Sequence, residues 1–226
     1  LSMHFSRNLP TMSKSSKHIP FSSTHVFSKL INDYLEGKGN AMDFVQYAPN
    51  VDGYKAAIEG RKKYPINRTL LFDVLTKQYS NLTQEKAVHD QIALLKKDTT
   101  FVVTTAHQPN LFTGPLYFFY KIIHAIQLAA SLKATFPEYD FVPVYYMGSE
   151  DADLDEVGAF NLDHKKCQWV TKQTGAIGRM QVDEALLGLL KQLESYWSIL
   201  PQGHKALEIL KEAYQKGNSI SEATLS

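Results

Sequence analysis

The chain has 226 residues, of which 44% are hydrophobic and 21% are charged, a balance typical of a globular protein. Its formal net charge of +1 provides no bulk field that would favour nucleic acid or an anionic membrane. The single cysteine excludes an internal disulfide, and no apolar run approaches the roughly 20 residues of a membrane-spanning helix. We therefore expect a cytoplasmic protein that binds neither nucleic acid nor membranes.

The first hundred residues are predicted to be mainly helical. Residues 1–20 are polar and Ser-rich, and we expect a disordered extension there. The stretch TMSKS at 11–15 resembles the KMSKS loop of class I aminoacyl-tRNA synthetases, but that loop follows the nucleotide-binding half, so we interpret the match as chance. Residues 21–98 are predicted to form a helical region packed on the core. Its helices are expected at 21–36, ended by Gly37, at 54–63 and 68–79, and at 83–97, capped by Thr83.

The central residues, 99–157, predict a β-α-β unit. Residues 101–105 and 141–147 are β-branched and aromatic runs typical of buried strands. Between them, apolar residues three and four apart predict a helix that starts at Pro115, with Thr113 or Gly114 as its cap. Strands joined by such a helix run parallel, so the fold class is α/β. Pro143 is an objection, because proline within a sheet favours edges or strand starts.

Two polar loops are expected to meet at one edge of this sheet. Parallel strands end at the same edge, where open α/β sheets bind ligands. The loop after Thr105 contains His107, whose imidazole can transfer protons or contact a phosphate, or only cap the helix. The acidic loop at 148–156 could bind Mg²⁺, bind the ammonium of an amine substrate, or stabilise a helix N-terminus. The other histidines show no metal-ligand spacing, and we assign no residue as a metal ligand.

The remaining residues, 158–226, predict a connecting segment and helices. Short strands are expected at 159–162 and 167–171 around a turn at 163–166, followed by a glycine-rich turn at 174–178. Helices are expected at 183–198 and 204–216, and a further one starts at Ile220. The pattern stops in mid-element, so we expect a truncated region. Cys167 has no evident base partner and is interpreted as a bystander.

Two signatures resemble one known family. The sequence HQPNLFTGPLY at 107–117, followed by Lys121, is similar to the bacillithiol biosynthesis cysteine-adding enzymes, the BshC family. The second signature is VPV at 142–144 followed by SEDAD at 149–153, where many members carry E-D-H-D and this chain has Ala152 at the histidine position. The resemblance runs from about Lys17 to the end of the chain, roughly the amino-terminal half of a typical member.

This resemblance implies a Rossmann-like core, similar to that of class I synthetases and nucleotidylyltransferases, followed by a coiled coil that could form a homodimer. It implies a ligase that joins the carboxyl group of L-cysteine to the amine of glucosaminyl-malate, with ATP or ADP as a possible cofactor. Residues 107–110 lie where the synthetases carry H-I-G-H, although Pro109 and Asn110 depart from that motif. We predict three catalytic residues and two groups of substrate-binding residues: catalytic His107, Gln108 and Asn110; substrate-binding Thr113, Gly114, Tyr117 and Lys121; and, opposite them, Ser149, Glu150, Asp151 and Asp153.

Two other hypotheses stay open at this point. One is a synthetase-like nucleotidylyltransferase with another substrate, and the other is a non-catalytic fragment that binds a ligand or a partner. A ligand screen separates the first from the ligase, because only the ligase should respond to glucosaminyl-malate.

Overall fold

The computed structural model describes residues 17–80 and 86–226. The contacts divide the chain into two compact units, with the boundary between Ile66 and Asn67. The TMSKS stretch, nearly all of the predicted N-terminal extension and the Thr83 cap lie outside the described residues. Among the helices of the described ranges, none is long and apolar enough to cross a membrane.

The first unit contains short helices joined by capped turns. The single helix predicted at 21–36 is wrong, because His25 adopts a left-handed backbone conformation (φ 56°) and Ser28 caps a second helix. Gly37 ends that second helix in the left-handed region, as predicted. The next α-helix begins earlier than predicted, because Asn50 accepts a backbone N–H three residues on at 2.8 Å. The elements are α1 Phe21–Thr24, α2 Lys29–Glu36, η1 Gly39–Phe44 and α3 Val51–Arg61.

The second unit is built around two parallel strands, β1 (Thr100–His107) and β2 (Asp140–Met147), connected by helix α6 (Tyr117–Thr135). The register runs from Thr100 opposite Asp140 to His107 opposite Met147, which confirms the β-α-β unit and the α/β fold class. In the described part of the chain β2 pairs only with β1, so Pro143 lies in a strand with an open edge. Strand β1 is longer than predicted and includes His107 as its last residue.

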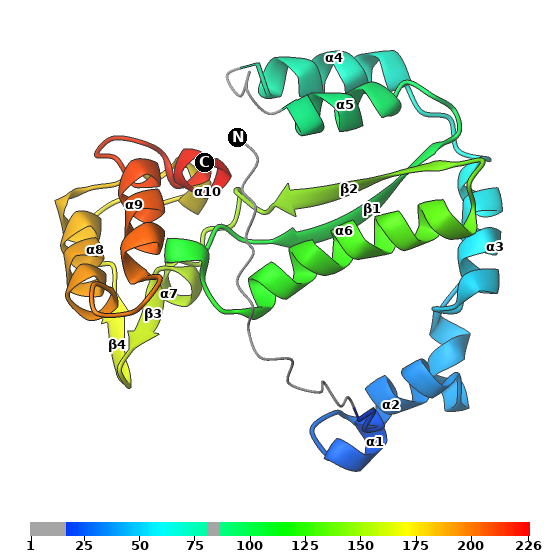
Figure 1. The fold of residues 1–226 in the computed structure, drawn as a ribbon, viewed down its shortest axis with the longest axis horizontal. Helices are drawn as coiled ribbons and strands as arrows, with labels where there is room; N and C mark the ends of the chain where they lie inside the picture. The colour runs from blue at the N-terminus through cyan, green and yellow to red at the C-terminus, as the bar shows by residue number, and fades with distance from the viewer. Residues whose placement is uncertain (1–16, 81–85) are drawn as a thin grey trace, which may run out of the picture. The chain divides into compact units, whose positions relative to one another are not determined.

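Two helices flank the strand pair on the side opposite to α6 in the view of Figure 1. These are α4 (Arg68–Gln78) and α5 (Lys86–Leu94). The Arg68 guanidinium donates hydrogen bonds to the carbonyl oxygens of Leu95 at 2.9 Å and Thr100 at 3.1 Å. Because these carbonyls lie between α5 and the start of β1, Arg68 ties α4 to the first residues of the sheet.

The start of α6 differs from the prediction. Pro115 is not its first residue and neither Thr113 nor Gly114 caps it; the helix begins at Tyr117 without a side-chain cap. The reason is a tight turn in the preceding segment, η2 (Leu111–Thr113), where Phe112, Thr113 and Gly114 all have positive φ angles of 51°, 75° and 64°. These three residues therefore lie outside α6, because residues with positive φ angles cannot be part of a right-handed helix.

The C-terminal part of the second unit is a small hairpin followed by packed helices (Figure 1). The hairpin turn is shorter than predicted, because Asp163 and His164 both take positive φ and close a two-residue turn. The predicted helices at 183–198 and 204–216 are present, and Asp183 caps the first by accepting the Leu186 N–H at 2.9 Å. The elements are α7 Leu154–Val157, β3 Ala159–Leu162, β4 Lys165–Gln168, η3 Ile177–Arg179, α8 Glu184–Trp197, α9 Gly203–Ala213 and α10 Ile220–Leu225.

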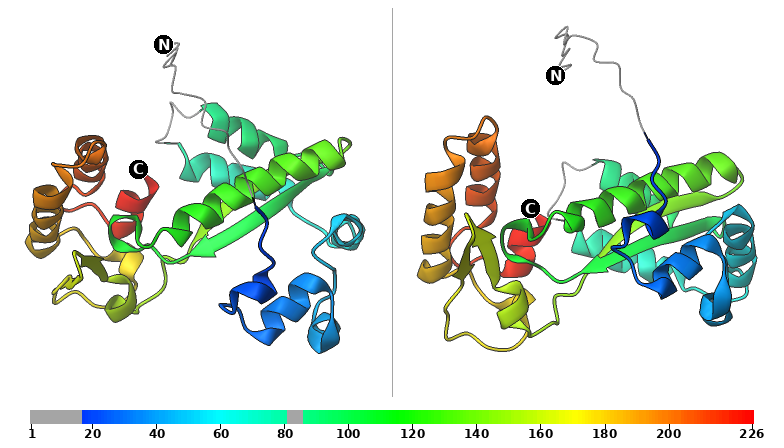
Figure 2. Two further views of the ribbon diagram at one scale, coloured as in Figure 1. Left: turned by 60° about the horizontal axis from the view of Figure 1, so that its bottom comes forward. Right: turned by 90° about the horizontal axis from the view of Figure 1, so that it is seen from below.

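One buried cluster holds these C-terminal elements together. We call it the C-terminal core; its members are Leu111, Phe112, Val157, Trp169, Ile177, Met180, Val182, Leu186, Leu189, Leu190, Leu193, Leu207, Leu210, Ala213, Tyr214, Ile220 and Ala223. Leu111 and Phe112 are the two members that come from outside the C-terminal elements, and η2 contacts α10. The loop after β1 is therefore anchored in the C-terminal core, a junction that can be followed in both views of Figure 2.

Candidate functional site

The side chain of His107 is held by hydrogen bonds on both ring nitrogens. Its Nε2 lies 2.9 Å from the Tyr117 hydroxyl oxygen, and its Nδ1 lies 2.8 Å from Asn110 Nδ2 and 3.0 Å from the Gln108 carbonyl oxygen. His107 ends β1, Gln108 and Asn110 follow it in the loop, and Tyr117 opens α6. The structure thus brings together His107, Asn110 and Tyr117, three of the residues predicted from sequence. Gln108 contributes its carbonyl oxygen to this group.

The loop between β1 and α6 closes tightly around Asn110. A Cβ placed on Gly114 would lie 2.5 Å from the Asn110 Cβ, so only glycine fits at this position. Pro109 is fully buried and Thr113 is exposed. Gly114 therefore has a structural role in fixing the loop, and its predicted substrate contact remains a prediction.

Lys121 lies one turn along α6 from Tyr117 and interacts with the end of β1. Its Nζ donates a hydrogen bond to the Ala106 carbonyl oxygen at 2.6 Å. On β2, the Tyr145 hydroxyl donates to the His107 carbonyl oxygen at 3.0 Å, and burial raises the pKa of Tyr145 to about 12. The carboxyl end of β1 is thus fixed from the helix and from the neighbouring strand. Sequence reasoning missed Tyr145 as a support of His107, because strand alternation alone did not show whether Tyr145 or Tyr146 faces the site.

The acidic loop is organised mainly by its own hydrogen bonds. Asp153 caps α7 by accepting the Glu156 N–H at 3.1 Å, and Asp151 accepts the Asp153 N–H at 2.8 Å. The Tyr146 hydroxyl donates to Glu150 at 3.2 Å, and this carboxylate raises the pKa of Tyr146. The acids therefore stabilise a short helix start, one of the three alternatives considered for them. In the described residues no group of three or more His, Cys, Asp or Glu side chains could hold a metal ion.

The two predicted loops are adjacent through their backbones. The Gly148 N–H donates to the His107 carbonyl oxygen at 2.9 Å, which places the second loop beside the first at the carboxyl edge of the sheet. Within the described ranges, no hydrogen bond or ion pair joins the acidic side chains to His107, Asn110 or Tyr117. The common edge expected from parallel topology is confirmed, and the substrate-binding roles of Ser149, Glu150, Asp151 and Asp153 stay predictions.

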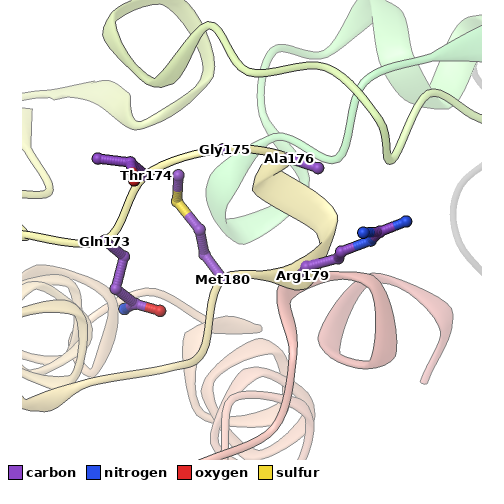
Figure 3. Close-up of a pocket in the computed structure, with 6 residues that line it drawn as sticks. All are labelled: Gln173, Thr174, Gly175, Ala176, Arg179 and Met180. Carbon is purple, nitrogen blue, oxygen red and sulfur yellow. The ribbon is translucent and has the colours of Figure 1, made fainter.

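A third segment, the predicted glycine-rich turn, adjoins the acidic loop. Its backbone donates from Ile177 to the Asp151 carbonyl oxygen at 2.7 Å and from Gly178 to the Ser149 carbonyl oxygen at 3.0 Å. The same turn borders a cavity of about 410 Å³, lined by Gln173, Thr174, Gly175, Ala176, Arg179 and Met180. Figure 3 shows Met180 directed toward Thr174 and Arg179 directed away from both. The cavity therefore lies next to the acidic loop but is lined by a residue set that sequence reasoning did not select.

Phe112 anchors the His107 loop in the C-terminal core. Its positive φ angle strains the backbone, and the contacts of its N–H and its ring stabilise it there. The Phe112 N–H donates to the Tyr214 hydroxyl oxygen at 2.8 Å, and the Phe112 ring lies 4.8 Å from the Tyr214 ring and 5.3 Å from the Phe160 ring. Burial raises the pKa of Tyr214 to about 12, against an opposing effect of the Phe112 N–H. Tyr214 is a second residue that sequence reasoning missed, since 102 positions separate it from Phe112.

Comparisons with known proteins identify the family of this chain. The family model described as "Bacillithiol biosynthesis BshC, N-terminal Rossmann-like domain" matches residues 15–226. Proteins named "Putative cysteine ligase BshC" are 36% identical over 209 residues in Flavobacterium psychrophilum and 38% identical over 213 residues in Christiangramia forsetii, each covering 91% of this chain and 39% of the relative. The protein of the same name from Cytophaga hutchinsonii is 38% identical over 198 residues, covering 88% of this chain and 36% of the relative.

The chain therefore spans about two fifths of the length of these relatives. The matched region includes both signature loops, the parallel strands that carry them and the C-terminal core. This chain belongs to the BshC family and contains its N-terminal Rossmann-like domain.

Proposed function

We propose that this chain supplies the Rossmann-like part of a cytoplasmic ligase of bacillithiol biosynthesis. The reaction joins the carboxyl group of L-cysteine to the amine of glucosaminyl-malate. Membership of the BshC family supports this proposal. The observation that carries it is the hydrogen-bonded group of His107, Asn110 and Tyr117 at the carboxyl edge of the sheet, where α/β enzymes bind small ligands.

The chemistry of amide formation suits this position. When an amine attacks an acyl group, negative charge develops on the carbonyl oxygen, and fixed hydrogen-bond donors stabilise it. The Tyr117 hydroxyl lies at the start of α6, where the helix dipole also favours negative charge. In this proposal Glu150, Asp151 and Asp153 orient the attacking amine from the adjacent loop.

The resemblance suggested ATP or ADP as a possible cofactor, but three positions of this loop offer no backbone N–H to a phosphate group. Pro109 has no N–H, the Phe112 N–H is bound by Tyr214, and the Gly114 N–H is bound by the Leu111 carbonyl oxygen. A glycine-rich phosphate loop instead leaves successive backbone N–H groups available to the ligand. The proposed function therefore assigns no phosphate contact to residues 108–114 and derives no step through a nucleotide.

A chimera tests the proposed function. Residues 15–226 replace the matched segment of the Flavobacterium psychrophilum relative, and bacillithiol is measured by mass spectrometry in a bacterium that lacks its own BshC. We expect the chimera to restore bacillithiol and His107→Ala to lower the rate by about 100-fold, the usual effect of misplacing a group in the site. His124→Ala, an exposed histidine further along α6, is the matched control and should have no effect.

Two outcomes would contradict the proposal. One is a chimera that makes no bacillithiol although the intact relative does. The other is a His107→Ala chimera that is as active as its parent, which would remove the catalytic assignment of the His107 loop.

A further inference from the structure

The hydrogen bonds around His107 determine which of its ring nitrogens carries the proton. Asn110 Nδ2 is a donor with no acceptor capacity, and it lies 2.8 Å from His107 Nδ1. With the Asn110 amide in this orientation, Nδ1 accepts the hydrogen bond, which places the proton of the neutral ring on Nε2. The second Asn110 N–H reaches the Gln108 carbonyl oxygen at 3.3 Å, so both amide hydrogens have acceptors.

The opposite tautomer conflicts with this arrangement. A proton on Nδ1 would donate to the Gln108 carbonyl oxygen at 3.0 Å, but it would also face the Asn110 N–H. Two donors directed at each other at this separation are repulsive, and the Asn110 amide would have to rotate. Asn110 thus selects the Nε2–H form of His107.

This selection determines what Tyr117 can do. Nε2–H donates to the Tyr117 hydroxyl oxygen at 2.9 Å, so the Tyr117 hydrogen is directed elsewhere. Tyr117 is 52% exposed, and within the described ranges its hydroxyl makes no other hydrogen bond. The His107 ring is part-buried and has both nitrogens engaged, so the group that can reach a ligand directly is the Tyr117 hydroxyl.

Resting on the proposed function, we propose that Tyr117 donates a hydrogen bond to a substrate carboxylate and that His107 acts through Tyr117 as a positioning residue. We take a carboxylate as the ligand group, because a single neutral hydroxyl supplies one hydrogen bond and both substrates of the proposed reaction carry a carboxylate. The test distinguishes these two substrates. His107 holds the Tyr117 oxygen in place and keeps its hydrogen free for the ligand.

The tautomer is measured directly by ¹⁵N NMR of the full chain labelled in its histidine rings, with His107→Gln to assign the signals. We expect His107 to carry its proton on Nε2 in the parent chain. In Asn110→Ala the Gln108 carbonyl oxygen becomes the unopposed partner of Nδ1, so the proton should move to Nδ1. A proton on Nδ1 in the parent chain would overturn the proposal whatever the ligase activity is.

Binding is measured by calorimetry with four separate probes: glucosaminyl-malate, L-cysteine, inorganic phosphate and ATP. Tyr117→Phe should weaken carboxylate binding by about 10-fold to 100-fold, the usual loss for a hydrogen bond to a charged group. Asn110→Ala should cause a similar loss although Tyr117 is intact, and the double variant should lose little more, because both changes remove the same donor. Tyr120→Phe, 66% exposed one turn along α6, is the matched control.

The four probes also identify the source of the carboxylate. A loss of affinity confined to glucosaminyl-malate assigns Tyr117 to the malate carboxylates. A loss of affinity confined to L-cysteine assigns Tyr117 to the carboxylate of the amino acid. If Tyr117→Phe weakens the binding of phosphate and ATP only, the carboxylate assignment is overturned. If Tyr117→Phe changes the affinity for none of the four probes, the proposal is overturned. An inactive chimera with the expected tautomer and binding losses would contradict the proposed function alone.

Discussion

The β1-α6-β2 unit and the C-terminal core bury their apolar residues to very different extents. In the C-terminal core Ile177, Leu186 and Ile220 are 0% exposed. On α6, by contrast, Tyr120 is 66% exposed and Ile123 is 53% exposed, and Phe119 and Ile126 on the same helix are also exposed. Helices normally cover both faces of a parallel sheet, and two strands offer too little surface to bury α6.

The candidate site depends on both of these regions. Its functional groups come from the sparsely covered β1-α6-β2 unit, but the loop that carries them is fixed by Leu111 and Phe112 in the tightly packed C-terminal core. A conformation with three successive positive φ angles is costly, and it persists where surrounding packing over-determines it. We therefore expect the geometry of the site to depend more on the C-terminal core than on the exposed face of α6.

The largest expected effect is that of Phe112→Ala. Removing a buried aromatic ring leaves a cavity, and we expect the free energy of unfolding to fall by about 3–5 kcal/mol in urea titrations. Ile123→Ala, at a half-exposed position of α6, should cost less than about 1 kcal/mol. If the Phe112→Ala chain does not fold, Phe112→Leu gives a smaller loss that can still be measured. Equal losses of unfolding free energy in Phe112→Ala and Ile123→Ala would contradict the difference between the C-terminal core and the exposed face of α6.

An intermediate effect is expected for Tyr214→Phe. This change keeps the ring but removes the oxygen that accepts the Phe112 N–H, so a buried donor loses its partner. The cost should be about 1–3 kcal/mol of unfolding free energy, and the Phe112 amide should exchange its hydrogen faster. Tyr196→Phe on α8, which is 39% exposed, serves as the control and should change neither quantity. Unchanged exchange at Phe112 would mean that packing alone holds the loop.

The smallest expected effect concerns Asp183, which accepts hydrogen bonds from the Trp169 indole at 2.8 Å and the Leu186 N–H at 2.9 Å. Burial raises the pKa of Asp183, but hydrogen bonds from the Leu186 N–H and from the Trp169, Thr171 and Gln173 side chains together outweigh burial, and the net pKa is below its ordinary value. Since the folded-state pKa is lowered, the stabilisation is present above the ordinary value and is lost as the pH falls through the folded pKa.

Asp183→Asn tests this dependence, because asparagine keeps an acceptor oxygen but has no charge. We expect it to cost about 1 kcal/mol of unfolding free energy at neutral pH, roughly the difference between a hydrogen bond to a charged group and one to a neutral group. The difference from the parent chain should shrink in acid, once Asp183 itself is protonated. Asp163→Asn in the exposed hairpin turn is the control. A difference that does not change with pH would show that the charge of Asp183 contributes nothing to the C-terminal core.

Local sequence patterns predicted most of the elements in the second unit. The helix at 183–198, the parallel strands and the common edge of the two loops follow from periodicity and from the length of the crossover. The errors lie where backbone conformation depends on distant contacts. Pro115 and Thr113 were assigned to the start of α6 by local rules, but Phe112 turns the chain there because its ring is buried in the C-terminal core.

The sequence by itself determined the α/β class and the identity of the residues gathered around His107, because strand, loop and helix signals are local and parallel strands share an edge. Only the tertiary structure decided that Asn110 faces Nδ1 of His107 and Tyr117 faces Nε2, since this depends on three positive φ angles in the intervening loop. It also decided that Tyr214 anchors that loop. A contact across 102 positions arises from packing, and no local pattern encodes it.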